Sequence, residues 1–192
     1  MTSASTNGHA ARVPRQPWPL FFAKGLAAVA LLYTAGHFAA QRWQLGIDPQ
    51  AQVSVHTADG ASPRLVIVDR YDRDMARGDI AAFEMNSVAK QMVASTGLGI
   101  PADILNKRVA GLPGDHIVVN EQGVFVNGIK RADGLALAGT FGRTPAAFTR
   151  RLTVPEGHFF MLGDAVASFD SRYWGLLDEA ELIGTTHVLY AE

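Results

Sequence analysis

The chain has 192 residues, a formal net charge of -1 and 48% hydrophobic residues, and it contains no cysteine. This length suits one main domain with room for an appendage, and the hydrophobic content suffices for a sizeable core. Without cysteine, the chain cannot form disulfides, thiolate metal sites or a cysteine nucleophile. A charge balance this close to zero gives no indication of nucleic-acid binding.

An apolar segment near the N-terminus is the first distinctive feature. Residues 1–17 are small and polar, and we expect them to form a disordered tail. Residues 18–40 are almost wholly apolar and long enough to cross a bilayer as a helix. Trp18 and Trp43 suit the two membrane interfaces. The sequence therefore predicts one N-terminal transmembrane helix.

The positive charges around this segment predict its orientation. Arg12, Arg15 and Lys24 lie on its N-terminal side, against Arg42 alone at the far end. The positive-inside rule then places the N-terminus in the cytoplasm and the rest of the chain outside the membrane. Two alternatives stay open. A cleaved signal peptide would have a shorter apolar core and a clear small-x-small cleavage site, and a buried core helix is usually shorter.

The remainder of the chain has the pattern of a mainly β domain. An irregular stretch over 44–61 is followed by predicted strands at 64–69, 79–83, 104–112, 116–120, 124–127, 152–154, 158–162 and 184–190. Helical spacing predicts an inserted helix over 86–99, and a run rich in Gly and Ala predicts a surface excursion over 131–150. Many short strands with hairpin turns and few helices predict a mainly β fold for residues 44–192.

The stretch KRVAGLPGD, residues 107–115, combines a lysine with a sharp turn. Lys107 and Val109 should share one face of a strand, and the glycines and the proline turn the chain. A lysine that points into an apolar surface loses hydration, which makes the neutral amine more accessible. A neutral lysine can act as a general base. The alternative is a solvated lysine on an edge strand.

A second stretch, GDAVASFDSRYWG at 163–175, completes a pattern. By itself it predicts a solvated polar turn. Together, the two stretches resemble the motifs of the type I signal peptidases, in the form K-R-V-x-G-x-P-G-D followed by G-D-x(3)-S-x-D-S-R-Y-W-G. The short spacing from Gly163 to Ser168, and the small size of the chain, look more like the TraF-type peptidases of conjugative transfer systems. The resemblance covers roughly residues 54–190. It implies a signal-peptidase-like β fold and a serine nucleophile paired with a lysine base.

The resemblance also implies where the reacting groups lie. Ser54 matches the nucleophile, which in the family follows the membrane segment and precedes the first long strand, and Lys107 matches the base. Ser62, almost against that strand, is the rival nucleophile. Family members usually carry an aliphatic residue and a proline after the serine, whereas Val55 and His56 follow Ser54 here.

Four further residues complete the site that the resemblance implies. Ser168 matches the serine that orients the lysine, and Asp170 and Arg172 match a structural ion pair behind the site. Gln52 occupies the position of a small hydroxyl residue that often helps to stabilise the oxyanion, and its amide is a candidate donor. A serine–lysine dyad needs neither a metal nor an organic cofactor, so we expect none.

Histidine-based chemistry is the alternative for the site. Histidines are spread along the chain at His56, His116, His158 and His187. A Ser-His-Asp triad could use one of them with Ser54 or Ser168, but no G-x-S-x-G elbow is present. A zinc site would need clustered ligands such as H-E-x-x-H, which are also missing.

We therefore expect a serine endopeptidase, anchored in the bacterial inner membrane, with its catalytic domain in the periplasm. The resemblance implies that it removes leader peptides from exported proteins, which bind as an extended strand along an edge of the enzyme. Its partners would be inner membrane lipid and a precursor, such as a conjugative pilin or another transfer-apparatus protein. A housekeeping signal peptidase and a catalytically inactive assembly subunit of a secretion system are the alternatives.

Overall fold

The computed structural model describes residues 18–47, 62–97, 100 and 103–192. Ser54 and Gln52 lie outside the described residues. The chain divides into two units, Met1–Ala40 and Gln41–Glu192.

The first unit is dominated by one helix, α1 (Trp18–Arg42). It covers the predicted apolar segment and ends two residues beyond it. Large apolar side chains such as Phe22, Leu26 and Leu31 are exposed, and by length and composition Phe21–Arg42 could cross a membrane. A helix that is hydrophobic all round needs an apolar environment, and both a membrane anchor and a signal sequence satisfy that condition.

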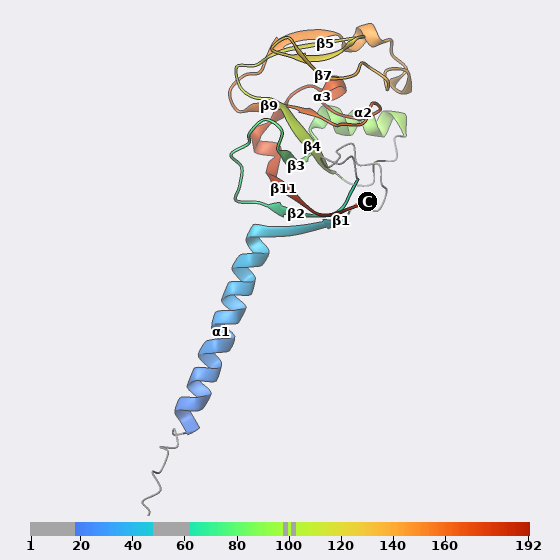
Figure 1. The fold of residues 1–192 in the computed structure, drawn as a ribbon. Helices are drawn as coiled ribbons and strands as arrows, with labels where there is room; N and C mark the ends of the chain where they lie inside the picture. Colours follow the sequence, from blue (N-terminus) through green and yellow to red (C-terminus); the bar gives the residue numbers. More distant parts are fainter. Residues whose placement is uncertain (1–17, 48–61, 98–99, 101–102) are drawn as a thin grey trace, which may run out of the picture. The chain divides into compact units, whose positions relative to one another are not determined.

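The second unit is mainly β, as predicted (Figure 1). A seven-stranded sheet has the order β1-β2-β11-β3-β4-β9-β10, and a four-stranded sheet has the order β7-β6-β5-β8. The larger sheet contains β1 (Trp43–Ile47), β2 (Pro63–Asp69), β3 (Ile80–Glu84), β4 (Ile104–Gly111), β9 (His158–Leu162), β10 (Leu177–Asp178) and β11 (Leu182–Ala191). The smaller sheet contains β5 (His116–Asn120), β6 (Gly123–Val126), β7 (Ile129–Ala132) and β8 (Arg150–Thr153).

Strand β1 corrects the expectation of irregular structure for residues 44–47, and the rest of that predicted stretch, 48–61, lies outside the described residues. It pairs antiparallel with β2, from Trp43 opposite Asp69 to Ile47 opposite Leu65. The segment WQLGI is only five residues long, which is too short to show a clear alternation of apolar and polar residues. Its hydrogen-bonding partner, β2, lies later in the chain, so the local sequence did not indicate the pairing. The last strand, β11, lies between β2 and β3 and completes the sheet (Figure 1).

The predicted inserted helix is present as α2 (Ser87–Thr96). Its N-cap is Asn86, whose side-chain oxygen accepts a hydrogen bond from Ala89 N at 2.8 Å. It ends at Gly97, which adopts the left-handed conformation that glycine tolerates best. Only Ala89 of this helix is fully buried.

Most of residues 131–150 are exposed or half-buried, as a surface excursion would be, but three of their side chains reach the core. Leu135, Ala138 and Phe148 are buried. The segment forms two short 3-10 helices, η1 (Gly139–Phe141) and η2 (Pro145–Phe148), and its aromatic rings pack on the helix α3 (Ser171–Trp174). A third, η3 (Glu179–Glu181), precedes β11. Two short 3-10 turns have no sustained hydrophobic period, so the sequence pattern did not indicate their buried side.

The turn after β4 is held by the carboxylate of Asp115. Its Oδ2 accepts hydrogen bonds from Leu112 N and Arg77 Nη2, both at 2.6 Å, and its Oδ1 accepts one from Asn127 Nδ2 at 2.7 Å. Burial by itself would raise the pKa of Asp115, but these three donors lower it overall. Gly114, at φ +87, supplies the backbone conformation that the turn requires.

Asp115→Asn should destabilise the protein in a pH-dependent way. At pH 7 the variant loses a charged acceptor for three donors, and we expect a loss of about 1–3 kcal/mol in the free energy of unfolding. Because the native pKa is lowered, the wild-type advantage is fully present above the usual value of 3.8 and declines as the pH falls below it. Guanidinium unfolding of the detergent-solubilised chain at about pH 7 and about pH 3, followed by tryptophan fluorescence, measures this. An equal difference at both pH values would contradict it.

Candidate active site

Lys107 lies in the middle of β4 with its side chain buried. The residue is 6% exposed, and β3 places the small Ala81 opposite it. Its Nζ donates a hydrogen bond to Ser168 Oγ at 3.2 Å, although the two residues are 61 positions apart in the chain. The structure thus places Ser168 beside Lys107, where the sequence predicts a serine that orients the lysine. Ser54, the predicted partner of Lys107 in the dyad, lies outside the described residues.

Ser168 is itself buried, at 2% exposure, and sits in the loop between β9 and α3. Its backbone N–H donates to Ala165 O at 3.1 Å, which closes a turn within the loop. A hydroxyl in this position accepts a hydrogen bond from the lysine and limits the rotation of the amine about the end of its long side chain. That restriction is what an orienting residue has to provide.

Behind Ser168, Asp170 and Arg172 form an ion pair with both side chains fully buried. Arg172 Nε and Nη2 each lie 2.8 Å from a different oxygen of the Asp170 carboxylate, which is the two-pronged geometry that guanidinium favours. Burial lowers the pKa of Arg172, but the neighbouring carboxylate more than offsets this effect and raises it. The predicted pair is therefore present as a charged structural unit.

The ion pair connects three segments of the chain. The Asp170 carboxylate accepts from Gly163 N at 2.9 Å, where the loop begins, and from Arg172 N at 3.1 Å, where α3 begins. Arg172 Nη1 donates to the carbonyls of Asp133 and Gly134 at 2.9 and 3.1 Å. One buried pair thereby holds both ends of the Ser168 loop and attaches it to the 131–150 segment.

A second ion pair fastens the start of the loop to the lysine strand. Arg108 Nη2 lies 2.8 Å from Asp164 Oδ2, and both side chains are about one-third exposed. Arg108 follows Lys107 on β4, so its side chain points to the opposite face of the sheet. The loop is therefore attached to β4 on both sides of the strand.

Sequence reasoning missed two groups that support the loop. Tyr173 packs between Phe141 and Phe148, with ring centroids 5.2 Å from each, and its hydroxyl accepts from Leu137 N at 2.9 Å. Arg150 Nη2 donates to the carbonyl of Arg172 at 2.8 Å. No local pattern indicated these contacts, because each joins residues more than twenty positions apart.

The rival residues are placed differently. The backbone of Ser62 pairs with Glu192 next to the start of β2, and its hydroxyl makes no hydrogen bond within the described part of the chain. His116 bonds Thr153 Oγ1, and His158 bonds Glu156 O, at exposed positions. Over the described ranges, no group of three or more His, Asp or Glu side chains could hold a metal ion. Within the described part of the chain, the printed side-chain contact of Ser168 is with Lys107 and not with a histidine.

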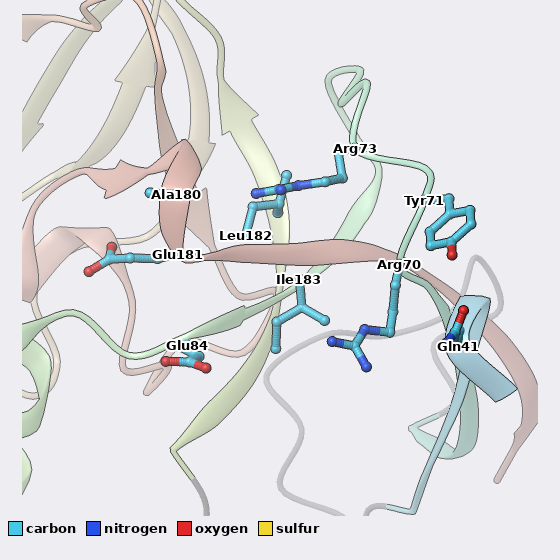
Figure 2. Close-up of a pocket in the computed structure, with 9 residues that line it drawn as sticks. All are labelled: Gln41, Arg70, Tyr71, Arg73, Glu84, Ala180, Glu181, Leu182 and Ile183. Carbon is cyan, nitrogen blue, oxygen red and sulfur yellow. The ribbon is translucent and has the colours of Figure 1, made fainter.

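A surface hollow of about 550 Å³ lies away from this site (Figure 2). It is lined by Gln41, Arg70, Tyr71, Arg73, Glu84, Ala180, Glu181, Leu182 and Ile183. Two of its charged side chains bind the short helix η3: Arg73 donates to Glu179 O at 2.7 Å, and Glu181 accepts from Asp178 N at 3.3 Å. Neither Lys107 nor Ser168 lines the hollow, so it is separate from the contact between these two residues.

Replacing Asp170 by Asn should be far more damaging than replacing Asp164. Asp170→Asn leaves Arg172 buried without its counter-charge, and we expect a loss of about 3–5 kcal/mol in the free energy of unfolding. The pair between Arg108 and Asp164, about one-third exposed, should contribute less than about 1 kcal/mol, so Asp164→Asn is the matched control. Denaturant unfolding of the solubilised chain measures both. Equal losses in the two variants would show that the buried pair has no special role in stability.

Comparison with known proteins agrees with the geometry. A family model described as "Signal peptidase, peptidase S26" matches residues 26–191. "Signal peptidase IB" of Staphylococcus aureus is 26% identical over 174 residues, 82% of this chain and 81% of the relative. "Probable signal peptidase I-2" of Synechocystis is 33% identical over 119 residues, 62% of this chain. The match spans only 49% of that relative's length.

A solved structure of a signal peptidase I from Enterococcus faecalis is 25% identical, covers 59% of this chain and 97% of its own, and has a TM-score of 0.36. The family model, by contrast, extends from within α1 to the end of β11 and includes both stretches that build the site. The chain therefore belongs to the signal peptidase family, peptidase S26.

Proposed function

We propose that this protein is a membrane-anchored serine endopeptidase that removes leader peptides from exported proteins. The buried contact between Lys107 Nζ and Ser168 Oγ supports this most directly. Burial costs an ammonium ion more hydration than a neutral amine, so it favours the basic form of the side chain. The hydroxyl of Ser168 then keeps the amine aimed at the nucleophile.

The dyad would work in two half-reactions. Lys107 removes the proton from the hydroxyl of Ser54 as the serine oxygen attacks the scissile carbonyl carbon. The amine then passes this proton to the leaving amino group, which breaks the peptide bond and leaves an acyl-enzyme. In the second half-reaction Lys107 activates a water molecule in the same way, and the acid product and free serine result. Gln52 and the backbone N–H of Ser54 are the proposed oxyanion donors.

The substrate would add to an open edge of β4. β9 pairs with β4 only from Arg108, which lies opposite Leu162, to Gly111. Within the described part of the chain, no strand pairs with that edge at residues 104–107. Alternate residues of this stretch direct their N–H and C=O groups to the open side, where an extended peptide can form backbone hydrogen bonds. A peptide bound there passes directly beside Lys107.

Helix α1 is the proposed inner-membrane anchor, with the N-terminus in the cytoplasm and the catalytic unit in the periplasm. Such an anchor would keep the site at the membrane where leader peptides emerge. A conjugative pilin or another transfer-apparatus precursor is the narrower substrate that we propose, on the basis of the short spacing from Gly163 to Ser168. The names of the relatives favour a second candidate, a signal peptidase for many exported precursors.

Cleavage of a co-expressed pilin precursor by the wild type and by alanine variants tests the proposal. We expect Lys107→Ala and Ser54→Ala to lose at least about a thousandfold in rate, because each removes one half of the dyad. Ser62→Ala is the matched control and should retain full cleavage. Mass spectrometry of the mature product measures all four proteins.

The pattern of failure identifies which part of the proposal is incorrect. Activity of Ser54→Ala with loss in Ser62→Ala would keep the lysine mechanism but move the nucleophile. Efficient cleavage of a panel of unrelated exported precursors would favour the general signal peptidase. If the wild type leaves every precursor intact, the chain is an inactive, membrane-anchored assembly subunit.

A further inference from the structure

The surface hollow beside η3 has a polar lining that the proposed peptidase chemistry does not use (Figure 2). Every residue that lines it belongs to the unit Gln41–Glu192. Its volume of about 550 Å³ lies within the range, roughly 300–1,000 Å³, of protein sites that bind small molecules. The hollow is therefore large enough to receive a small charged group.

The charged side chains that line the hollow balance each other. They are two arginines and two glutamates: Arg70, Arg73, Glu84 and Glu181. Within the described residues, the side chains of Arg70 and Glu84 make no hydrogen bond and no ion pair, and both are exposed. In Figure 2, Arg70 extends towards Ile183, and Glu84 lies on the other side of Ile183. The hollow thus offers a guanidinium and a carboxylate that are both available to a ligand.

A site with both signs of charge favours a ligand that also carries both. Guanidinium groups bind phosphate oxygens through paired hydrogen bonds, and a carboxylate accepts hydrogen bonds from a primary ammonium group. Arg73 is held in place by the hydrogen bond from its Nη2 to Glu179 O at 2.7 Å, and its guanidinium has further N–H groups. A simple anion would be repelled by the two glutamates, and a simple cation by the two arginines. A zwitterion with a phosphate and an ammonium group fits this lining best.

One lining residue connects the hollow to the proposed membrane anchor. Gln41 belongs to the last turn of α1 and directly follows Ala40, where the apolar segment ends. A helix rises about 1.5 Å per residue, and the polar layer on each side of a bilayer is roughly 5–7 Å thick. In a chain anchored by α1, Gln41 therefore lies at the level of the lipid head groups. Tyr71, which also lines the hollow and is 65% exposed, is a residue type enriched in that layer.

We propose that the hollow binds a membrane phospholipid whose head group is phosphoethanolamine, with Arg70 and Arg73 on the phosphate and Glu84 on the ammonium group. This inference rests on the membrane anchor in the proposed function and adds a specific lipid to it. A phosphocholine head group has no N–H to donate to Glu84, and a phosphoglycerol head group lacks the positive charge. A lipid bound in the hollow attaches the catalytic unit to the membrane surface at a second point besides the anchor.

Binding of short-chain phospholipids to the full-length, detergent-solubilised protein tests the proposal. The probes are dihexanoyl lipids with phosphoethanolamine, phosphocholine or phosphoglycerol head groups, and native mass spectrometry measures each Kd. We expect the wild type to bind the phosphoethanolamine lipid about three to ten times more tightly than the other two, as exposed charged hydrogen bonds allow. Arg70→Gln should weaken the binding of every phospholipid at this site. Glu84→Gln should remove the preference for phosphoethanolamine over phosphocholine.

Arg143→Gln controls for the loss of one positive charge elsewhere on the surface. Arg143 is also exposed but lies outside the hollow, in the 131–150 segment, so this variant should keep the wild-type Kd values. All three substitutions are at exposed positions and should leave the fold intact. An unchanged Kd in Arg70→Gln, an unchanged preference in Glu84→Gln, or tighter wild-type binding of the phosphoglycerol lipid would overturn the inference.

Further measurements distinguish this inference from the proposed function. Cleavage of the precursor in detergent without added phospholipid should be the same in Arg70→Gln and in the wild type, because neither Lys107 nor Ser168 lines the hollow. Intact Lys107-dependent cleavage without any lipid preference overturns the inference alone. Selective lipid binding by a chain that cleaves no precursor overturns the peptidase function and supports the inference. Release of the chain from membranes by alkaline carbonate would overturn the anchor and the inference with it.

Discussion

The buried ion pair between Asp170 and Arg172 is the interaction on which the rest of the site depends. Both side chains are fully buried, so their charges must be satisfied by each other and by the backbone groups around them. The Asp170 carboxylate accepts hydrogen bonds from the backbone N–H groups at the start of the loop and at the start of α3. Arg172 donates hydrogen bonds to the carbonyls of Asp133 and Gly134, in the 131–150 segment. A loop held at so many points keeps Ser168 within hydrogen-bonding distance of Lys107.

The two faces of strand β4 make different contacts. One face carries Lys107, which is buried beside the small Ala81 and directed to Ser168. The other face carries Asn106, which accepts a hydrogen bond from Thr186 of β11, and Arg108, which pairs with Asp164 at the start of the loop.

The smaller sheet and the 131–150 segment support the site without supplying a reacting group. Arg150 of β8 binds the carbonyl of Arg172, and Phe141 and Phe148 enclose the ring of Tyr173. These contacts explain why a segment with little regular structure has buried side chains such as Phe148. They also connect the stability of the second sheet to the position of α3 and, through it, to the Ser168 loop.

The sequence by itself determined the apolar helix, the mainly β class and the identity of Lys107, Ser168, Asp170 and Arg172 as related residues. These features depend on local composition and on motifs, which can be read along the chain. Only the tertiary structure decided that residues 43–47 form an edge strand, that Leu135, Ala138 and Phe148 reach the core, and that Asn106 bonds Thr186. Each of these features depends on a partner far away in the chain. The local sequence around a residue does not specify which distant side chain that residue will contact.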